Sequence, residues 1–256
     1  MTALKDKVAI ITGASSGIGR AAAKLFAAEG ARLVVTARRQ SELDALVGEI
    51  KAEGGEAIAV SGDIREEALA QRLVDTATER FGGLDIALNN AGIIGDLGPI
   101  GEMASANWHE VIAINLTSAF LGAKHQVPAL EARGGGSLIF TSSFVGYTAG
   151  LAGMSVYAAS KAGQIGLVKA LAAELGGKRI RVNALLPGGT DTPAATTNAP
   201  GAGPEVLAFV KGIHALKRMA QPQEIARAAL FLASDASSFV TGTAFLADGG
   251  VSIQRG

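Results

Sequence analysis

The chain contains no cysteine, which excludes a disulfide framework and catalysis by a thiolate. Aromatic residues make up 5% of the 256 residues and apolar residues 48%, so the core must be mainly aliphatic. Patterns of metal ligands are missing as well. The histidines His109, His125 and His214 share no ligand spacing, and the sequence has no HExxH motif. We therefore expect no metal site.

Excess charge of either sign is also missing, because 23 lysines and arginines balance 23 aspartates and glutamates. A basic excess would indicate nucleic acid as a partner, and an acidic excess a solvated tail. No apolar run is long enough and free enough of glycine and proline to predict a membrane-spanning helix. The N-terminus lacks the long apolar region of a signal peptide. We expect a cytoplasmic protein that binds neither nucleic acid nor membranes.

What the sequence does contain is a regular alternation of strand and helix patterns. Residues 7–12, "KVAIIT", form a short apolar run rich in β-branched residues, whereas the alanine-rich residues after it have helical spacing. Strands are predicted at 7–12, 32–37, 56–63, 84–92, 136–143, 179–188 and 242–250. Helices are predicted at 17–30, 41–55 (with Ser41 as N-cap), 66–83, 106–132, 157–175 and 222–234. Apolar strands separated by single helices indicate an α/β fold, a Rossmann-like doubly wound parallel sheet of about seven strands with helices on both faces.

This pattern predicts one domain over residues 1–256. Its least regular stretch, residues 189–210, is rich in threonine, alanine, proline and glycine. So long a segment in a compact domain is usually a lid or binding loop, or else disordered. We predict a mobile substrate loop at about 189–212.

A glycine-rich turn follows the first predicted strand. The sequence "TGASSGIG" places Gly13, Gly17 and Gly19 between a strand and a helix, although the spacing differs from the common G-x-G-x-x-G fingerprint. Such a turn lets the backbone approach a pyrophosphate at a helix N-terminus, where free N–H groups attract anions. The alternative is a glycine-rich turn that binds nothing.

The end of the second strand bears on the choice of cofactor. A site for NAD usually has an acidic residue there, which binds the ribose 2′-hydroxyl, but this sequence has Ala37, Arg38 and Arg39. Arginine attracts a 2′-phosphate and can bind it through two hydrogen bonds, which favours NADP(H) over NAD(H). Two solvated surface arginines are the alternative. Asp63, after the third strand, either meets the adenine edge or caps the next helix.

Six motifs together resemble the short-chain dehydrogenase/reductase family. They are "TGASSGIG", "NNAG" at 89–92, Asn115, the serines of "TSS", "YAASK" and "PGGTDT", and they occur in the order and context of that family over nearly the whole chain. The resemblance is to its single-domain branch of about 250 residues. It implies an NAD(P)-dependent oxidoreductase and assembly into a homotetramer or homodimer, and the small residues Ala158, Ala162, Gly166 and Ala170 would permit close helix approach.

The resemblance makes Tyr157 the general acid/base. A hydride that moves to a carbonyl carbon leaves charge on the oxygen, so a proton donor must meet that oxygen. Free tyrosine has a pKa of about 10, and the Lys161 cation one turn further on, with the charge of the oxidised cofactor, should lower it. Lys161 would also bind the nicotinamide ribose. The alternative is a buried tyrosine beside a snorkelling lysine.

Three further roles follow from the same resemblance. Ser143 is favoured over Ser142 as the donor that polarises the substrate, and Ser142 would then bond backbone at the strand end. Asn115 would break its helix locally and hold a water on a proton path to Lys161, or else be a satisfied core asparagine. The residues implied to bind the cofactor are Gly13, Ser15, Ser16, Gly17, Ile18, Gly19, Arg38, Arg39, Asp63, Ile64, Asn90, Ala91, Gly92, Tyr157, Lys161, Pro187, Gly188, Thr190 and Thr192.

The expected function is an NADPH-dependent carbonyl reductase or alcohol dehydrogenase. The predicted pocket wall is mostly apolar, with Ile94 to Leu97, Val145, Tyr147, Leu151 and Met154, so we expect a neutral, hydrophobic ketone, aldehyde or secondary alcohol as the substrate. Two alternatives are an NAD-dependent secondary-alcohol dehydrogenase and a non-catalytic dinucleotide-binding sensor. A serine hydrolase that uses the doubled serine is disfavoured, because neither Ser142 nor Ser143 lies in a G-x-S-x-G motif and no histidine is suitably placed.

Overall fold

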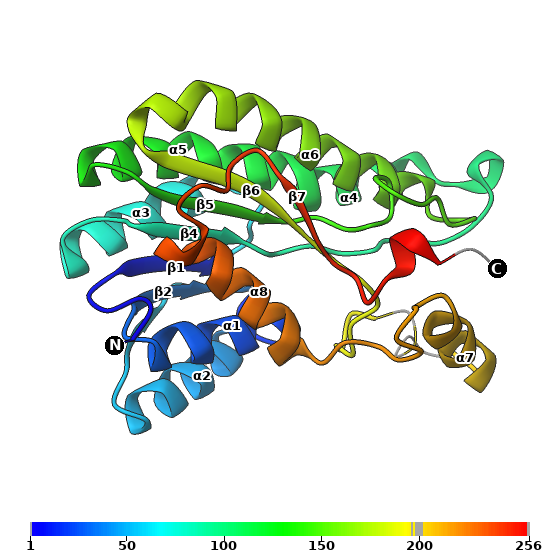
Figure 1. Cartoon of the computed structure of the whole chain (residues 1–256), viewed down its shortest axis with the longest axis horizontal. Helices are drawn as coiled ribbons and strands as arrows, with labels where there is room; N and C mark the ends of the chain where they lie inside the picture. Colours follow the sequence, from blue (N-terminus) through cyan, green and yellow to red (C-terminus); the bar gives the residue numbers. More distant parts are fainter. Residues whose placement is uncertain (1, 196, 198–201, 255–256) are drawn as a thin grey trace.

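A computed structural model describes residues 2–195, 197 and 202–254. In these residues seven parallel strands form one sheet in the order β3-β2-β1-β4-β5-β6-β7 (Figure 1). The strands are β1 (Val8–Thr12), β2 (Arg32–Thr36), β3 (Glu56–Ala59), β4 (Ile86–Asn89), β5 (Gly136–Thr141), β6 (Ile180–Pro187) and β7 (Ala244–Ala247). The predicted doubly wound parallel sheet is therefore confirmed.

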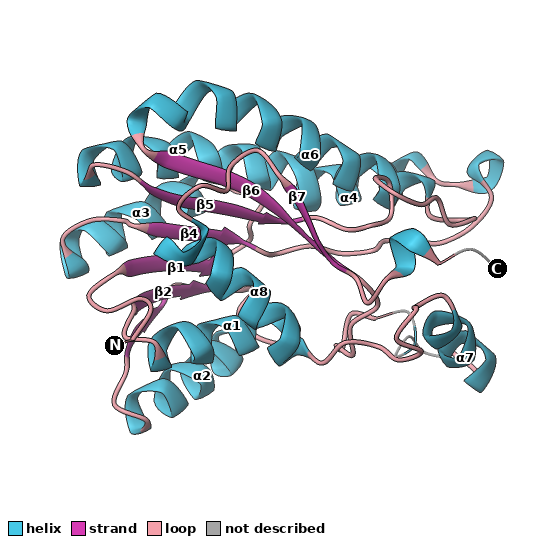
Figure 2. Cartoon of the chain, in the orientation of Figure 1, coloured by secondary structure: helices cyan, strands magenta, loops and turns pink. Residues whose placement is uncertain are grey.

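Two layers of helices cover the sheet (Figure 2). One core contains buried side chains from α1 (Gly17–Ala28), α2 (Gln40–Ala52) and α8 (Pro222–Ala233). The other contains side chains from α3 (Glu67–Phe81), α5 (Ser118–Arg133) and α6 (Ser155–Leu175). Because both faces of the sheet are covered, central strands such as β1 are buried along their whole length. The largest fully buried side chains are Phe26 and Phe140 with leucines and isoleucines, as the aromatic-poor composition predicts.

The structure corrects two predicted helix boundaries. The helix expected at 106–132 consists of α4 (Ser105–Ile112), a π-helical segment (Ala113–Thr117) and α5. The helix expected at 41–55 begins at Gln40, so Arg39 is its N-cap residue and Ser41 is not. Arg39 makes no side-chain cap hydrogen bond, and the apolar face of α2 (Leu43, Leu46 and Ile50) decides where the helix packs.

The second half of the predicted substrate loop contains a helix, α7 (Pro204–Gly212). Residues 196 and 198–201 of that loop lie outside the described residues. Figure 1 shows α7 beyond the carboxyl ends of the strands, apart from the two helix layers. No residue of α7 is buried. Its mobility stays a prediction.

The strand order reverses between β1 and β4, which run side by side. In open α/β sheets, ligands bind in the crevice at the carboxyl ends of strands where the order reverses. Here the two strand ends are joined by Thr12, whose Oγ1 accepts hydrogen bonds from the backbone N–H groups of Asn90 and Ala91, both at 2.9 Å. The Asn90 side chain in turn donates to the Thr12 carbonyl at 3.1 Å. This junction fixes the floor of the crevice.

Replacement of Thr12 by valine should destabilise the protein by about 2 kcal/mol or more, because two backbone N–H groups lose their acceptor at a site that is 2% exposed. Thr12→Ser keeps the hydroxyl and should cost less than about 1 kcal/mol. Urea unfolding of the two variants and the wild type measures the difference. Equal stabilities for Thr12→Val and Thr12→Ser would contradict the role of the hydroxyl.

Candidate active site

A cavity of about 1090 Å³ occupies the crevice at the carboxyl ends of the strands. Its lining includes every residue predicted from the sequence to act in catalysis or cofactor binding except Gly19 and Asn115. These two residues lie behind the wall. A Cβ atom on Gly19 would lie 2.3 Å from the Gly13 carbonyl oxygen, and Asn115 is fully buried. Gly19 therefore allows the glycine turn to close rather than touching a ligand directly.

The glycine turn has the geometry that a pyrophosphate requires. Gly13 and Gly17 have φ angles of +68° and +54°, which residues with a side chain rarely adopt. A Cβ on Gly13 would also lie 2.9 Å from the Cα of Ala91. Ser16 is the N-cap residue of α1 and makes no side-chain cap hydrogen bond, so the first N–H groups of the helix face the cavity without a side-chain cap. The turn and the helix N-terminus fit an anionic phosphate group.

At the far end of the cavity, Arg38 and Arg39 line the wall together with Asp63. Arg39 donates a hydrogen bond of 3.3 Å to the hydroxyl of Ser15 on the glycine turn. Asp63 pairs with Arg65, and the hydrogen bond from that guanidinium holds the pKa of the Asp63 carboxyl below its usual range. The alternative that Asp63 caps the next helix is wrong, because Glu66 is the N-cap residue of α3.

Ser143 and Tyr157 both line the cavity, and a hydrogen bond joins their hydroxyl groups. The Ser143 Oγ accepts the Val145 backbone N–H at 3.1 Å, so its own proton is available to donate to Tyr157. Ser142 points elsewhere, because its hydroxyl donates to the Lys161 carbonyl at 2.9 Å. It thus bonds backbone, as the sequence predicts, but the backbone of α6 rather than that of its own strand end.

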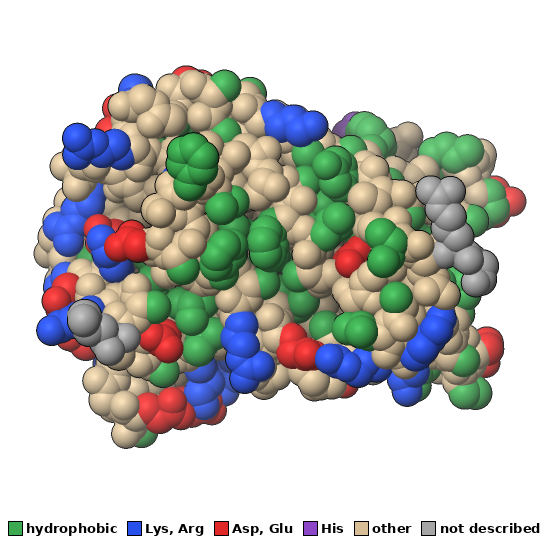
Figure 3. Space-filling model, in the orientation of Figure 1, with side chains coloured by type: hydrophobic (Ala, Val, Ile, Leu, Met, Phe, Trp, Pro, Cys, Tyr) green, Lys and Arg blue, Asp and Glu red, His purple; other side chains and the backbone are tan. Residues whose placement is uncertain are grey.

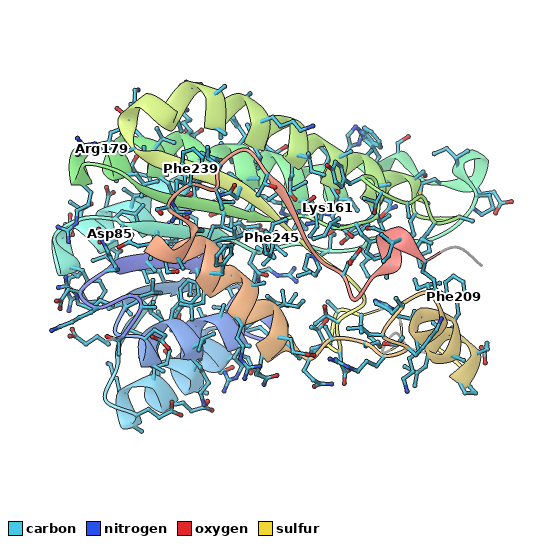
Figure 4. The ribbon with its side chains drawn as sticks, in the orientation of Figure 1. Asp85, Lys161, Arg179, Phe209, Phe239 and Phe245 are labelled. Carbon is cyan, nitrogen blue, oxygen red and sulfur yellow. The ribbon has the colours of Figure 1, made fainter. Side chains whose placement is uncertain are left out.

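Lys161, which is labelled in Figure 4, lies beside Tyr157. Its Nζ is 5.7 Å from the centre of the tyrosine ring. The lysine is 3% exposed and its Nζ donates to the Thr141 carbonyl at 2.8 Å. Burial lowers the pKa of Lys161 from 10.5 to about 7. Burial also raises the pKa of Tyr157, and the hydrogen bond with Ser143 opposes that rise. The expectation that Lys161 lowers the pKa of Tyr157 is therefore not met by the protein's own groups, because burial dominates both pKa shifts.

Asn115 lies in the π-helical segment, where the regular hydrogen-bond ladder of the helix is interrupted. Its side chain accepts a bond from Ile93 N and donates to Ile93 O and to Ser160 Oγ, each at 2.9 Å. The carbonyl of Asn115 accepts from Gln164 Nε2 at 2.7 Å. Both interpretations of Asn115 hold in part, since the helix is locally broken and the side chain is satisfied. A water on a path to Lys161 stays a prediction.

Gly92 connects this segment with the catalytic pair. A Cβ on Gly92 would lie 3.2 Å from Asn115 Oδ1 and 3.3 Å from Lys161 Nζ, so a side chain here would require both neighbouring side chains to shift by a few tenths of an ångström. Gln164 lies one turn beyond Lys161 and is 1% exposed. Its contact with Asn115 was not predicted, because no local pattern around Gln164 differs from an ordinary helix face.

The turn after β6 forms the last part of the cofactor end. Pro187, Gly188, Thr190 and Thr192 line the cavity, but the Thr190 hydroxyl donates to the Gly188 carbonyl at 3.0 Å and so shapes its own turn. Thr192 lies against the glycine turn, because a Cβ on Gly17 would come within 3.0 Å of its Cγ2. His214, for which no local sequence pattern predicts a role here, accepts a hydrogen bond from Gly189 N at 2.9 Å.

The remaining wall of the cavity is apolar. Its side chains come from the loop after β4, from the loop between β5 and α6, and from the region of α7, and they include Ile94, Leu97, Val145, Leu151, Met154, Val206, Phe209 and Met219. Tyr147, predicted as part of this wall, does not line the cavity and is 47% exposed. The charged lining residues are Arg38, Arg39, Asp63 and Lys161. None of them belongs to the apolar wall.

The described residues also bear on metal binding and membrane insertion. No three His, Cys, Asp or Glu side chains among them are grouped so that they could hold a metal ion. None of the helices in this part of the chain is both long and apolar enough to cross a membrane.

Lys161→Met should change the pH dependence of stability. Between about pH 7 and 10, folded wild-type protein has lost the Lys161 proton that the unfolded chain retains. The unfolded state then binds more protons, so wild-type stability rises with pH relative to the variant, by roughly 1.4 kcal/mol per pH unit. Urea unfolding from about pH 6 to 10 measures this slope, with the exposed Lys169 replaced by methionine as the control. Parallel pH curves for Lys161→Met and wild type would contradict the lowered pKa.

Comparisons with known proteins agree with this geometry. Residues 13–252 match the family model described as enoyl-(acyl carrier protein) reductase. Cyclohexanol dehydrogenase of an Acinetobacter species is 39% identical over 95% of this chain and 94% of its own length.

Two solved structures are similar over most of their length. A 7α-hydroxysteroid dehydrogenase complexed with NADH and 7-oxo glycochenodeoxycholic acid is 37% identical, with a TM-score of 0.90 over 96% of this chain and 94% of that one. A candidate NAD(P)-dependent gluconate 5-dehydrogenase from Beutenbergia cavernae with bound NADP is 35% identical, with a TM-score of 0.90 over 98% of each chain. The chain belongs to the short-chain dehydrogenase/reductase family, and it is an oxidoreductase that acts on alcohols or ketones with a nicotinamide cofactor.

Proposed function

We propose that the protein is an NADPH-dependent carbonyl reductase for uncharged, apolar ketones, with Tyr157 as the proton donor. The observation that carries this proposal is the position of Ser143, Tyr157 and Lys161, which meet in the cavity between the phosphate-binding turn and the apolar wall. A hydride acceptor that sits at this point has a proton donor on one side and apolar surface on the other.

The residues present fit a dinucleotide. Its pyrophosphate would lie at the glycine turn, where Gly13, Gly17 and the N-terminus of α1 offer backbone N–H groups. Asn90 and Gly92 would lie along its adenosine half, and Pro187 and Gly188 would shape the nicotinamide end. When bound, the reduced nicotinamide supplies a hydride to the carbonyl carbon of the substrate.

The two arginines support the choice of NADPH. Arg38 and Arg39 line the end of the cavity after β2, where an acidic residue would be needed for the 2′-hydroxyl of NAD. The nearest acid that lines this end, Asp63, is already held by Arg65. A 2′-phosphate would therefore meet the guanidinium groups of Arg38 and Arg39, and the charge of the Asp63 carboxylate is already balanced by its ion pair with Arg65.

The pKa shifts favour a reductive role for the catalytic pair. A raised pKa keeps the Tyr157 hydroxyl protonated at neutral pH, so Tyr157 is ready to donate to the oxygen on which negative charge develops. When a ketone is bound, the Ser143 hydroxyl turns from Tyr157 and donates a second hydrogen bond to the same oxygen, while its Oγ still accepts from Val145 N–H. Lys161, with a pKa of about 7, exchanges protons readily near neutral pH and can restore the proton of Tyr157.

The apolar wall decides the substrate class. Leu151, Met154, Val206 and Phe209 are among the side chains of this wall, none of which is charged, so a carboxylate or phosphate on the substrate would lose its hydration without gaining a partner. We propose alicyclic ketones as the substrates, and the similarity to cyclohexanol dehydrogenase supports this class. The same similarity favours the direction of the second candidate, oxidation of a secondary alcohol, and the NADH complex of the 7α-hydroxysteroid dehydrogenase favours NAD as its cofactor.

Assembly and location stay predictions. In support of a homotetramer or homodimer, Phe239 is fully exposed and Leu246 is 39% exposed, and Figure 3 shows hydrophobic side chains gathered over the face with α8 and β7. Ala162, Gly166 and Ala170 on α6 are exposed on another face. The cytoplasmic location has no structural test.

Absorbance of the reduced nicotinamide should fall when the protein is mixed with NADPH and an alicyclic ketone such as cyclohexanone. The absorbance should fall much more slowly when the ketone carries a carboxylate. Tyr157→Phe should lower kcat/KM by at least about 100-fold, because the proton donor is lost. Ser143→Ala should lower it by about 100-fold, since one donor to the developing oxyanion is lost.

Ser142→Ala is the matched control for Ser143→Ala and should retain most of the activity of stably folded protein. A larger loss from Ser142→Ala than from Ser143→Ala would overturn the assignment of the serine. Cofactor binding without turnover of any ketone or alcohol would favour the sensor.

Arg38→Ala should raise KM for NADPH by about 10- to 100-fold, because a charge-assisted hydrogen bond to the 2′-phosphate is worth about 1.5–3 kcal/mol. KM for NADH should change by less than about threefold, because NADH has no such phosphate. Initial rates with both cofactors measure the two constants. Faster turnover of NADH than of NADPH by the wild type would contradict the proposed preference for NADPH.

A further inference from the structure

His214 is a buried imidazole that the catalytic proposal does not use. It is 1% exposed and lies directly after α7, between the turn that follows β6 and the turn that follows β7. Both ring nitrogens are bonded to backbone. Nδ1 bonds to the Val210 carbonyl at 2.5 Å, and Nε2 bonds to the Gly189 N–H at 2.9 Å. Each bond reaches a different wall of the cavity.

The two partners fix the state of the imidazole. A carbonyl oxygen can only accept, so Nδ1 must carry the proton that is donated to Val210. A backbone N–H can only donate, so Nε2 must be unprotonated to accept from Gly189. The ring is therefore the neutral Nδ1–H tautomer, and it joins the two backbone groups as a donor on one side and an acceptor on the other.

Glycines make room for this ring. A Cβ on Gly188 would lie 2.8 Å from Nε2, one on Gly189 2.9 Å from Cε1, and one on Gly249 3.1 Å from Cδ2. Gly188 and Gly189 also line the cavity at the cofactor end. Three glycines thus lie in contact with the imidazole, and a side chain at any of these positions would require the ring to move.

The bond to Val210 matters because α7 is weakly attached. No residue of α7 is buried, yet Val206, Phe209 and Val210 form part of the apolar wall of the cavity. Figure 4 labels Phe209 on this helix. Val210 lies in the last turn of the helix, where carbonyl groups have no partner within the helix. His214 supplies that partner and connects the helix to the turn after β6.

We propose that His214 is a positioning residue that couples the substrate wall on α7 to the cofactor turn at Gly188–Gly189 through its two hydrogen bonds. Its donor side holds the substrate wall and its acceptor side holds the cofactor turn. The two sides act on different ligands, so they can be separated by substitution.

Two conservative variants separate the two bonds. His214→Asn places an amide at the position of Nδ1, which keeps the bond to Val210 and removes the acceptor for Gly189. His214→Gln places an amide oxygen at the position of Nε2, which keeps the acceptor for Gly189 and removes the donor to Val210. His214→Ala removes both. His109→Gln, at an exposed histidine on α4, is the control.

The two variants should change different measured quantities. His214→Asn should raise the NADPH dissociation constant, measured by fluorescence, by about 5- to 10-fold, with the exchange of α7 amide hydrogens unchanged. His214→Gln should leave NADPH binding within about twofold, speed hydrogen exchange at residues 204–212 and raise the ketone KM about 5- to 10-fold with kcat nearly unchanged. His214→Ala should show both effects.

Several results would overturn the coupling role. If His214→Asn and His214→Gln weaken NADPH binding and α7 protection to the same extent, His214 only fills space. If neither variant differs from His109→Gln, the two bonds carry no function. Urea unfolding identifies a variant that is merely unfolded. Cofactor binding and hydrogen exchange need no turnover, so a failure of the proposed ketone reduction leaves this test intact.

Discussion

The close approach of two strand ends is the constraint on which the site depends. Thr12 holds the ends of β1 and β4 together, and Gly13 lets the phosphate-binding turn pass within contact distance of Ala91. This junction determines where Gly92 lies, and Gly92 lets the chain pass close to both Asn115 and Lys161. The cofactor end and the catalytic end are therefore parts of one backbone arrangement.

Burial then sets the chemistry of the side chains at this junction. A sheet covered on both faces by aliphatic helices gives an environment in which a charged ammonium or phenolate is costly. Burial lowers the pKa of Lys161 to about 7 and raises that of Tyr157, so the amine titrates near neutral pH and the phenol keeps its proton. The apolar surroundings continue into the wall of the same cavity, and this continuity is the basis of the proposed ketone substrate.

Much of this could be read from the sequence, because it depends on local patterns. The apolar runs, the alanine-rich helices and the glycine turn each fix a short segment, and the family motifs identify the cofactor and catalytic segments in order. The choice of Ser143 over Ser142 is consistent with the hydrogen bonds, although the sequence alone left it open. Helix starts were less certain, since at Gln40 tertiary packing rather than a capping side chain sets the boundary.

What the sequence determined by itself was the order of strands and helices, the chemical types in the glycine turn and the spacing of Tyr157 and Lys161. Only the tertiary structure decided the π-helical segment at Asn115, the exposure of Tyr147, the direction of the Tyr157 pKa shift and the contacts of His214. Each of these depends on groups brought together from distant parts of the chain. Desolvation and hydrogen-bond partners are properties of the surroundings in space, and a local pattern in the sequence does not contain them.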